Sequence, residues 1–181
     1  MSERNDGAQI DPHRPAVYLG FSSVLHRGEG LLDDLGTVTL DSGEPPFHYG
    51  PLLIDVLMPY PDVQLVLTTA WVRKLGEQQT VALLPKELGN RVVDTTLRFP
   101  PRLGELRDGT ARVGSIFRHA ATAGMRTWLA LGDDLYGVPR DAESHFLRVS
   151  TETGLATPGT LEALRAWLAT NANPGRSQRP S

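Results

Sequence analysis

The sequence predicts an α/β fold in which a parallel five-stranded sheet is flanked by helices. Short apolar runs of strand length alternate with segments whose apolar residues recur at helical spacing. Such alternation builds right-handed strand–helix–strand units, and these units place their strands parallel in one sheet. A hydrophobic content of 40% in 181 residues is enough for one domain with a full core.

Both ends of the chain are polar. Residues 1–15 are aperiodic and are expected to form a disordered leader, while 171–181 contain Pro and Gly and are expected to form a disordered tail. The domain itself is expected over 16–170. It opens with the apolar run Ala16–Leu19, which precedes a turn of small residues and predicts the first strand.

A small insert is expected directly after the first strand. Residues 26–48 are rich in Gly, Asp and Pro, and the alternating segment 36–40 is typical of half a β-hairpin. The turn residues 41–43 follow that segment directly. We therefore expect the insert to form a flap.

The next elements are a helix and the second strand. Apolar residues at helical spacing predict a helix over 52–57, which Pro59 and Pro61 close. The apolar run 63–67 predicts the second strand, and it ends in the polar pair Thr68–Thr69.

A helical pattern and a third strand follow. The pattern covers 71–84, is interrupted at Gly76 and is stopped by Pro85. The short apolar segment 91–93 predicts the third strand.

In the last third of the chain, predicted helices and strands again alternate. Helical spacing at 113–120 precedes the fourth strand at 127–131, and the fifth strand is expected at 146–149. An amphipathic helix over 161–168 closes the domain.

Function is expected where the strands end. In parallel sheets, ligands bind beyond the carboxyl ends of the strands, at the point where the strand order reverses. The turns after the first, second and fourth strands occupy 20–23, 68–69 and 132–134. These turns contain the candidate site residues.

Five segments carry a resemblance to a known family. They occupy 16–28, 60–76, 84–96, 127–134 and 151–168. In this order and spacing the chain resembles the haloacid dehalogenase-like (HAD-like) hydrolase superfamily, and it looks closest to the small HAD domains of bacterial Swiss Army Knife RNA repair proteins. The resemblance implies a Rossmann-like, HAD-type sheet with a flap after the first strand.

The resemblance makes the turn after the first strand the place of the nucleophile. In the superfamily that turn supplies an aspartate that attacks phosphorus and, two residues later, an aspartate that acts as acid and base. Here these two positions hold Gly20 and Ser22. A carboxylate is needed to form the acyl phosphate intermediate, and glycine offers none.

The remaining motifs imply phosphate and metal contacts. The second motif supplies a hydroxyl that holds phosphate, here Thr68 with Thr69 as its neighbour. The third supplies a cation, and Arg112 lies where a lysine is usual. The fourth supplies carboxylates for magnesium, of which Asp133 and Asp134 remain, with Gly132 where a first acid often lies.

Each candidate also has a purely structural interpretation. Residues 20–23 are compatible with a tight turn that has lost its function. Thr68–Thr69 could cap the helix that begins near Trp71, and Asp133–Asp134 could stabilise the turn at a strand end. Arg112 could be a solvated residue at a helix start. The sequence leaves these alternatives open.

Two functions follow from these residues. The first is a degenerate HAD-like domain, a pseudoenzyme without phosphatase activity that acts as a binding, regulatory or structural module. The alternative is a metal-dependent phosphohydrolase with a rewired site, acting on a phosphorylated small molecule or a nucleic-acid end. Its missing acids would come from Asp33 or Asp34 in the flap.

Composition limits the partners and the compartment. The net charge of -3 and the pI of about 5.9 make nucleic acid an unlikely general partner. The chain has no cysteine, and it has no apolar run long enough for a membrane span or a signal peptide. We expect a cytoplasmic protein with no firmly indicated cofactor, weak support for magnesium, and a phosphate-bearing small molecule as its ligand.

Overall fold

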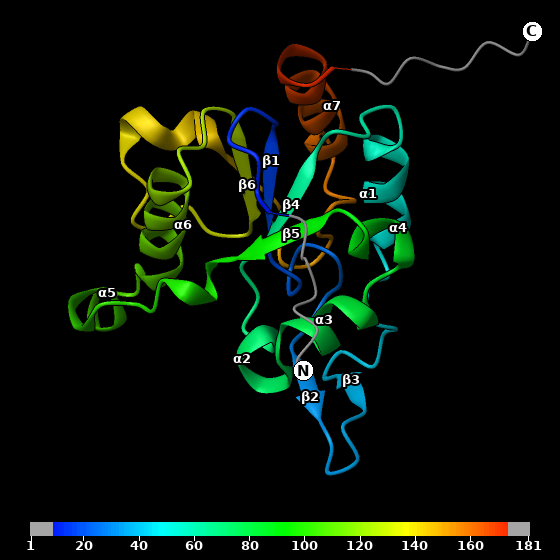
Figure 1. Ribbon diagram of the computed structural model, residues 1–181. Helices are drawn as coiled ribbons and strands as arrows, with labels where there is room; N and C mark the ends of the chain where they lie inside the picture. Colours follow the sequence, from blue (N-terminus) through cyan, green and yellow to red (C-terminus); the bar gives the residue numbers. More distant parts are fainter. Residues whose placement is uncertain (1–8, 174–181) are drawn as a thin grey trace, which may run out of the picture.

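The computed structural model describes residues 9–173, and a five-stranded parallel sheet lies at their centre (Figure 1). The strand order is β5-β4-β1-β6-β7. The strands are β1 (Ala16–Leu19), β4 (Gln64–Leu67), β5 (Val92–Thr95), β6 (Trp128–Gly132) and β7 (Phe146–Arg148). The predicted fold class is therefore confirmed, and each predicted strand is present to within about two residues at either end.

The central strand β1 pairs with a strand on each side. Val17 is in register with Leu65 of β4 and with Leu129 of β6. The chain reaches β4 first and β6 later, so the strand order reverses at β1. The carboxyl end of β1 is consequently the place where a doubly wound sheet opens a crevice.

Helices cover both faces of the sheet (Figure 1). Helices α1 (Gly50–Leu57) and α7 (Thr160–Asn171) pack on one face, and α6 (Ala111–Thr122) packs on the other. Alternate residues of β1 serve the two cores, with Val17 in the α1 and α7 core and Tyr18 in the α6 core. This double burial explains why the strands are continuous apolar runs.

Shorter helices lie around the sheet. They are α2 (Trp71–Leu75), α3 (Glu77–Leu83), α4 (Lys86–Gly89), α5 (Leu103–Asp108), and the 3₁₀ helices η1 (Thr96–Arg98) and η2 (Arg140–His145). The predicted interruption at Gly76 separates α2 from α3, where Gly76 adopts a φ of 83°. The sequence did not predict α4, α5, η1 or η2.

The insert contains a hairpin that projects beyond the sheet (Figure 1). Strand β2 (Gly30–Leu32) pairs antiparallel with β3 (Val38–Leu40). The turn expected at 41–43 is present, because the N–H of Gly43 donates to the carbonyl of Leu40 directly after β3. The turn that joins β2 to β3 lies before it, at 33–37, and was not predicted. The Asp33 carboxylate accepts the backbone N–H groups of Leu35 and Thr37 and holds that turn.

The residues before β1 contact the domain within the described range. The Gln64 side chain accepts the N–H of Asp11 and donates to its carbonyl, and Ile10 packs against the α6 core. The rest of the predicted leader, residues 1–8, and most of the predicted tail, residues 174–181, lie outside the described residues. Between residues 9 and 173, none of the helices has the length and apolarity that a membrane span requires.

Candidate functional site

A cavity of about 200 Å³ lies at the carboxyl ends of β1, β4 and β6. It forms at the predicted crevice and brings together residues from three turns and from the insert. Its lining consists of Gly20, Phe21, Ser22, Val24, Glu29, Thr68, Thr69, Ala70, Arg112, Leu131, Gly132 and Asp133. Six of the seven candidate residues from the sequence are therefore gathered in one place, and Asp134 is the exception.

The turn after β1 is fixed by its apolar members. The carbonyl of Phe21 accepts the N–H groups of Val24 and Leu25, and all three side chains are buried. Ser23 adopts a φ of 63°, which reverses the chain within one residue. Because the apolar side chains point into the core, the small residues on either side of Phe21 face the cavity.

Gly20 leaves space beside a free hydroxyl. A Cβ atom at this position would lie 3.4 Å from the Thr68 Oγ1, which is ordinary van der Waals contact. That oxygen is buried and has no hydrogen-bond partner among the described residues. A buried hydroxyl without a partner is unfavourable, so a ligand oxygen at this point would be stabilising.

Thr69 has a structural task that Thr68 does not have. Its Oγ1 accepts the backbone N–H of Trp71 at 3.3 Å, at the start of α2. The capping interpretation of the pair therefore applies to Thr69 and leaves Thr68 available to a ligand.

Arg112 fills the space that a side chain would need at Gly132, the last residue of β6. Its Nη2 donates to the carbonyl of Leu131 at 2.6 Å, and a Cβ atom at Gly132 would overlap the guanidinium. Burial lowers the pKa of Arg112, whereas the nearby charges of Asp133 and Asp134 raise it. Arginine stays protonated in proteins, so the cavity wall carries a fixed positive charge.

The two predicted metal ligands are separated. Asp133 lines the cavity, but Asp134 is exposed and its carboxylate accepts the N–H of Tyr136 at 2.7 Å. For Asp134 the turn interpretation is therefore the better one. Within residues 9–173, no three His, Asp or Glu side chains are grouped closely enough to hold a metal ion. Magnesium requires a near-octahedral oxygen shell, and the two carboxylates in the cavity lining, Asp133 and Glu29, with a guanidinium among them do not supply it.

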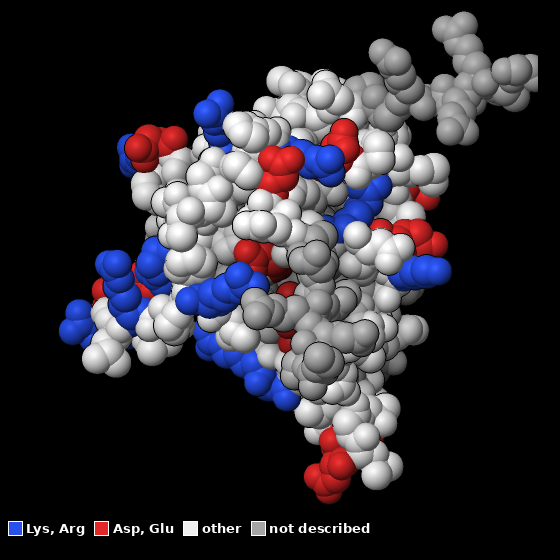
Figure 2. Space-filling model, in the orientation of Figure 1, with Lys and Arg blue, Asp and Glu red and all other residues white. Residues whose placement is uncertain are grey.

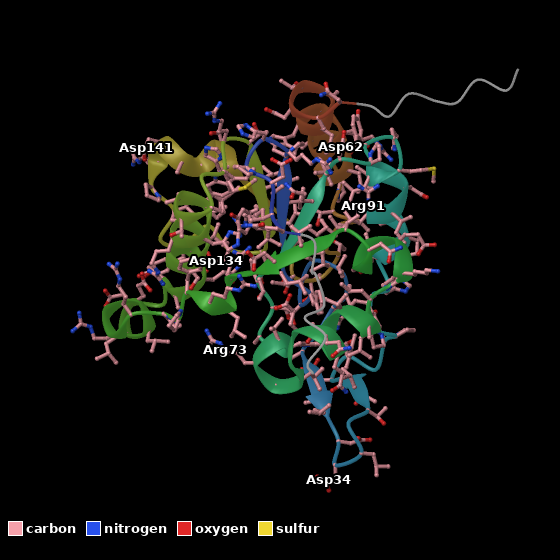
Figure 3. The ribbon with its side chains drawn as sticks, in the orientation of Figure 1. Asp34, Asp62, Arg73, Arg91, Asp134 and Asp141 are labelled. Carbon is pink, nitrogen blue, oxygen red and sulfur yellow. The ribbon has the colours of Figure 1, made fainter. Side chains whose placement is uncertain are left out.

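The flap acids proposed from the sequence do not reach the cavity. Asp33 is engaged in the hairpin turn, and Asp34 lies at the hairpin tip, away from Arg73 and Asp134 (Figure 3). Neither residue lines the cavity.

The insert instead contributes Glu29, which the sequence analysis missed. Its Oε2 accepts a hydrogen bond from the Ser22 Oγ at 3.0 Å. A carboxylate from the insert therefore contacts the position where the superfamily has its acid and base. In the sequence, Glu29 stands out only as an acid between two glycines, Gly28 and Gly30. Its hydrogen bond to Ser22 could not be predicted without the fold.

Both glycines are needed to place Glu29. Gly28 has a φ of 87°, and a Cβ there would overlap the Asp41 carboxylate; a Cβ at Gly30 would overlap the Trp71 ring. Asp41 also accepts the N–H of Glu29 at 2.8 Å. The main chain at Glu29 is thus held on both sides.

A second hollow of about 160 Å³ shares Arg112 with the cavity and adds Arg73 from α2. Around it, Lys and Arg side chains gather over α5 and below it toward α2, whereas the hairpin tip is acidic (Figure 2). The second hollow therefore has two arginines in its lining, whereas the cavity has Arg112 together with Glu29 and Asp133.

The strand order and the crevice at the carboxyl end of β1 define a Rossmann-like α/β domain. Residues 16–159 match the family described as HAD domain in Swiss Army Knife RNA repair proteins. The chain belongs to this family, and the predicted resemblance is confirmed. Neither the curated proteins nor the solved structures contain a match to it.

Proposed function

We propose that this HAD domain binds a phosphate-type oxyanion without magnesium and has no phosphatase activity. The observation that carries the proposal is the guanidinium of Arg112 in the space beside Gly132, where the superfamily often has an acid. A cation at this point attracts an oxyanion directly, and Gly132 offers no carboxylate to a metal ion. The domain then acts as a binding or regulatory module.

The missing carboxylate at Gly20 supports the loss of turnover. The superfamily reaction passes through an acyl phosphate, and no such intermediate can form on a glycine. Asp133 is the one acid of the fourth motif that lines the cavity. The metal-dependent alternative would need a second and a third oxygen ligand near it, and the flap acids are directed elsewhere.

Thr68 and Arg112 are the proposed ligand contacts. The Thr68 hydroxyl can donate to an oxyanion and thereby gain the partner that it lacks. Arg112 can donate charge-assisted hydrogen bonds from the same cavity. The ligand proposed first is a phosphate-bearing small molecule, and a nucleic-acid end is the second choice because of the family's link to RNA repair.

Calorimetric titration tests the proposal. The purified chain is titrated with tungstate, a phosphate mimic, in buffer containing EDTA. We expect saturable binding that added magnesium does not strengthen, and a loss of at least tenfold in affinity in Arg112→Met. Arg165→Met is the matched control, because Arg165 is exposed on α7 and far from the cavity lining.

Two results would contradict the proposal. One is tungstate binding that depends on magnesium. The other is magnesium-dependent hydrolysis of an aryl phosphate that disappears in Asp133→Asn, because it would identify a working metal site.

A further inference from the structure

We propose that Ser22 is a phosphoryl acceptor, with Glu29 as the base that takes its proton. The inference goes beyond oxyanion binding but rests on it, because the proposed oxyanion site would hold the phosphoryl donor. Its product is a phosphoserine on the domain, formed once per chain.

The first support is the pairing of the hydroxyl with the carboxylate. Ser22 Oγ donates to Glu29 Oε2 at 3.0 Å, and both residues line the cavity. The proton therefore points at the base, and a lone pair on Oγ is free for attack. A carboxylate is sufficient for this role, because phosphoryl transfer depends mainly on positioning and on stabilisation of charge.

The second support is the fixed position of the base. The N–H of Glu29 is bonded to Asp41, and the flanking glycines allow close packing against Asp41 and Trp71. The main chain that carries the base is therefore held before the reaction, which lowers the entropy lost when the transition state forms, while the exposed Glu29 side chain is placed by its bond to Ser22.

The third support is the oxyanion pair in the same cavity. Thr68 Oγ1 is buried without a partner among the described residues, and Arg112 supplies positive charge. Gly20, which precedes Ser22 by two residues, has no side chain to fill the space beside Thr68. The transferring group can therefore contact Thr68 and Arg112 while it faces Ser22.

The step balances without a metal ion or an oxidant. A bond forms between Ser22 Oγ and phosphorus, and the bond between phosphorus and the leaving oxygen breaks. The Ser22 proton passes to Glu29, and the leaving group departs as an anion with its electron pair. A donor with a stable leaving anion is required, so the substrate class is an acyl phosphate.

Mass spectrometry after incubation with acetyl phosphate in EDTA tests the inference. We expect one phosphoryl group per chain, located at Ser22 by fragmentation. Ser22→Ala should abolish it, and Glu29→Gln should slow it by about a hundredfold, the scale of base catalysis. Ser23→Ala is the matched control, because Ser23 is the adjacent serine but does not line the cavity.

Tungstate titration of the same proteins separates the two proposals. Ser23→Ala should bind tungstate as the unchanged chain does, and urea denaturation shows whether Ser22→Ala and Glu29→Gln are folded. Intact tungstate binding without phosphoserine overturns the inference and leaves the proposed function standing. An unchanged phosphorylation rate in Glu29→Gln also overturns the inference, and so does modification at serines other than Ser22. If the unchanged chain does not bind tungstate, both the inference and the proposed function are overturned.

Discussion

Arg112 and Gly132 depend on each other at the scale of single residues. The guanidinium donates to Leu131 and fills the volume that a side chain at 132 would need. Gly132 lies where the superfamily often has an acid, and the Arg112 guanidinium fills the space beside it. In the proposed function, the absence of a carboxylate at Gly20 and at Gly132, which line the same cavity, accounts for the lack of metal-dependent phosphoryl transfer.

We predict that Gly132→Ala destabilises the domain by about 1 kcal/mol, because the new methyl group displaces the end of the Arg112 side chain and breaks its hydrogen bond to Leu131. Urea denaturation measures the change. In a background of Arg112→Ala the same substitution should cost much less, since the space is then free. Gly104→Ala is the control: it lies in α5 with open space around its Cβ position and should be neutral or slightly stabilising. Equal costs in both backgrounds would contradict the proposed coupling.

The place of a residue in the fold was predictable from the sequence where that residue directly follows a strand. Gly20, Thr68 and Asp133 were placed correctly because parallel strands bring their carboxyl ends to one edge, and this rule needs only the order of the elements. Glu29 was not predictable in the same way. Its contact with Ser22 depends on how the insert returns to the site, which is set by tertiary packing of Gly30 on Trp71.

At the scale of elements, the insert is anchored by a buried histidine. His26 is fully buried, and its Nδ1 accepts the N–H of Phe47, so the two ends of the insert are joined. The Trp71 ring of α2 lies with its centre 5.5 Å from that of His26. The insert that supplies Glu29 is thus connected to the core at its base, while its hairpin projects away.

Burial lowers the pKa of His26 to about 4. In the unfolded chain the imidazole titrates near 6.5, so the unfolded state binds the proton first as the pH falls. We therefore predict that the free energy of unfolding decreases between about pH 6.5 and pH 4, by on the order of 3 kcal/mol from this group. Urea denaturation at several pH values measures it.

The control for this prediction is His26→Asn, whose amide oxygen can replace Nδ1 as the acceptor for Phe47. The variant should be less dependent on pH in that interval, whatever its stability at pH 7. An equally steep acid dependence in the variant would mean that other groups cause it.

The elements missed by the sequence have few buried side chains. Helix α5 buries none of its residues, and Leu103 is 86% exposed, so no apolar periodicity indicated a helix. Ion pairing of Glu105 with Arg118 of α6 holds α5 instead, and Gly114 provides room for it. Contacts of this kind depend on residues far apart in the sequence, whereas the core helices were predictable from spacing alone.

At the scale of the whole molecule, β1 connects the two cores to the site. Its residues alternate between the α1 and α7 core and the α6 core, and its carboxyl end opens into the cavity. The family fold is therefore retained in full, while its chemistry depends on a few residues in the turns. A stable domain with an altered site is what the proposed function implies, because core packing does not require acids in these turns.

The most direct test of the account is a crystal structure of the chain soaked with tungstate and magnesium. We predict an anomalous peak for tungsten in the cavity, with tungstate oxygens within hydrogen-bond distance of Thr68 Oγ1 and the Arg112 guanidinium and with Ser22 still donating to Glu29. We also predict no octahedral ion beside Asp133. A magnesium ion bound there through several protein oxygens, with Arg112 moved out of the cavity, would contradict the account.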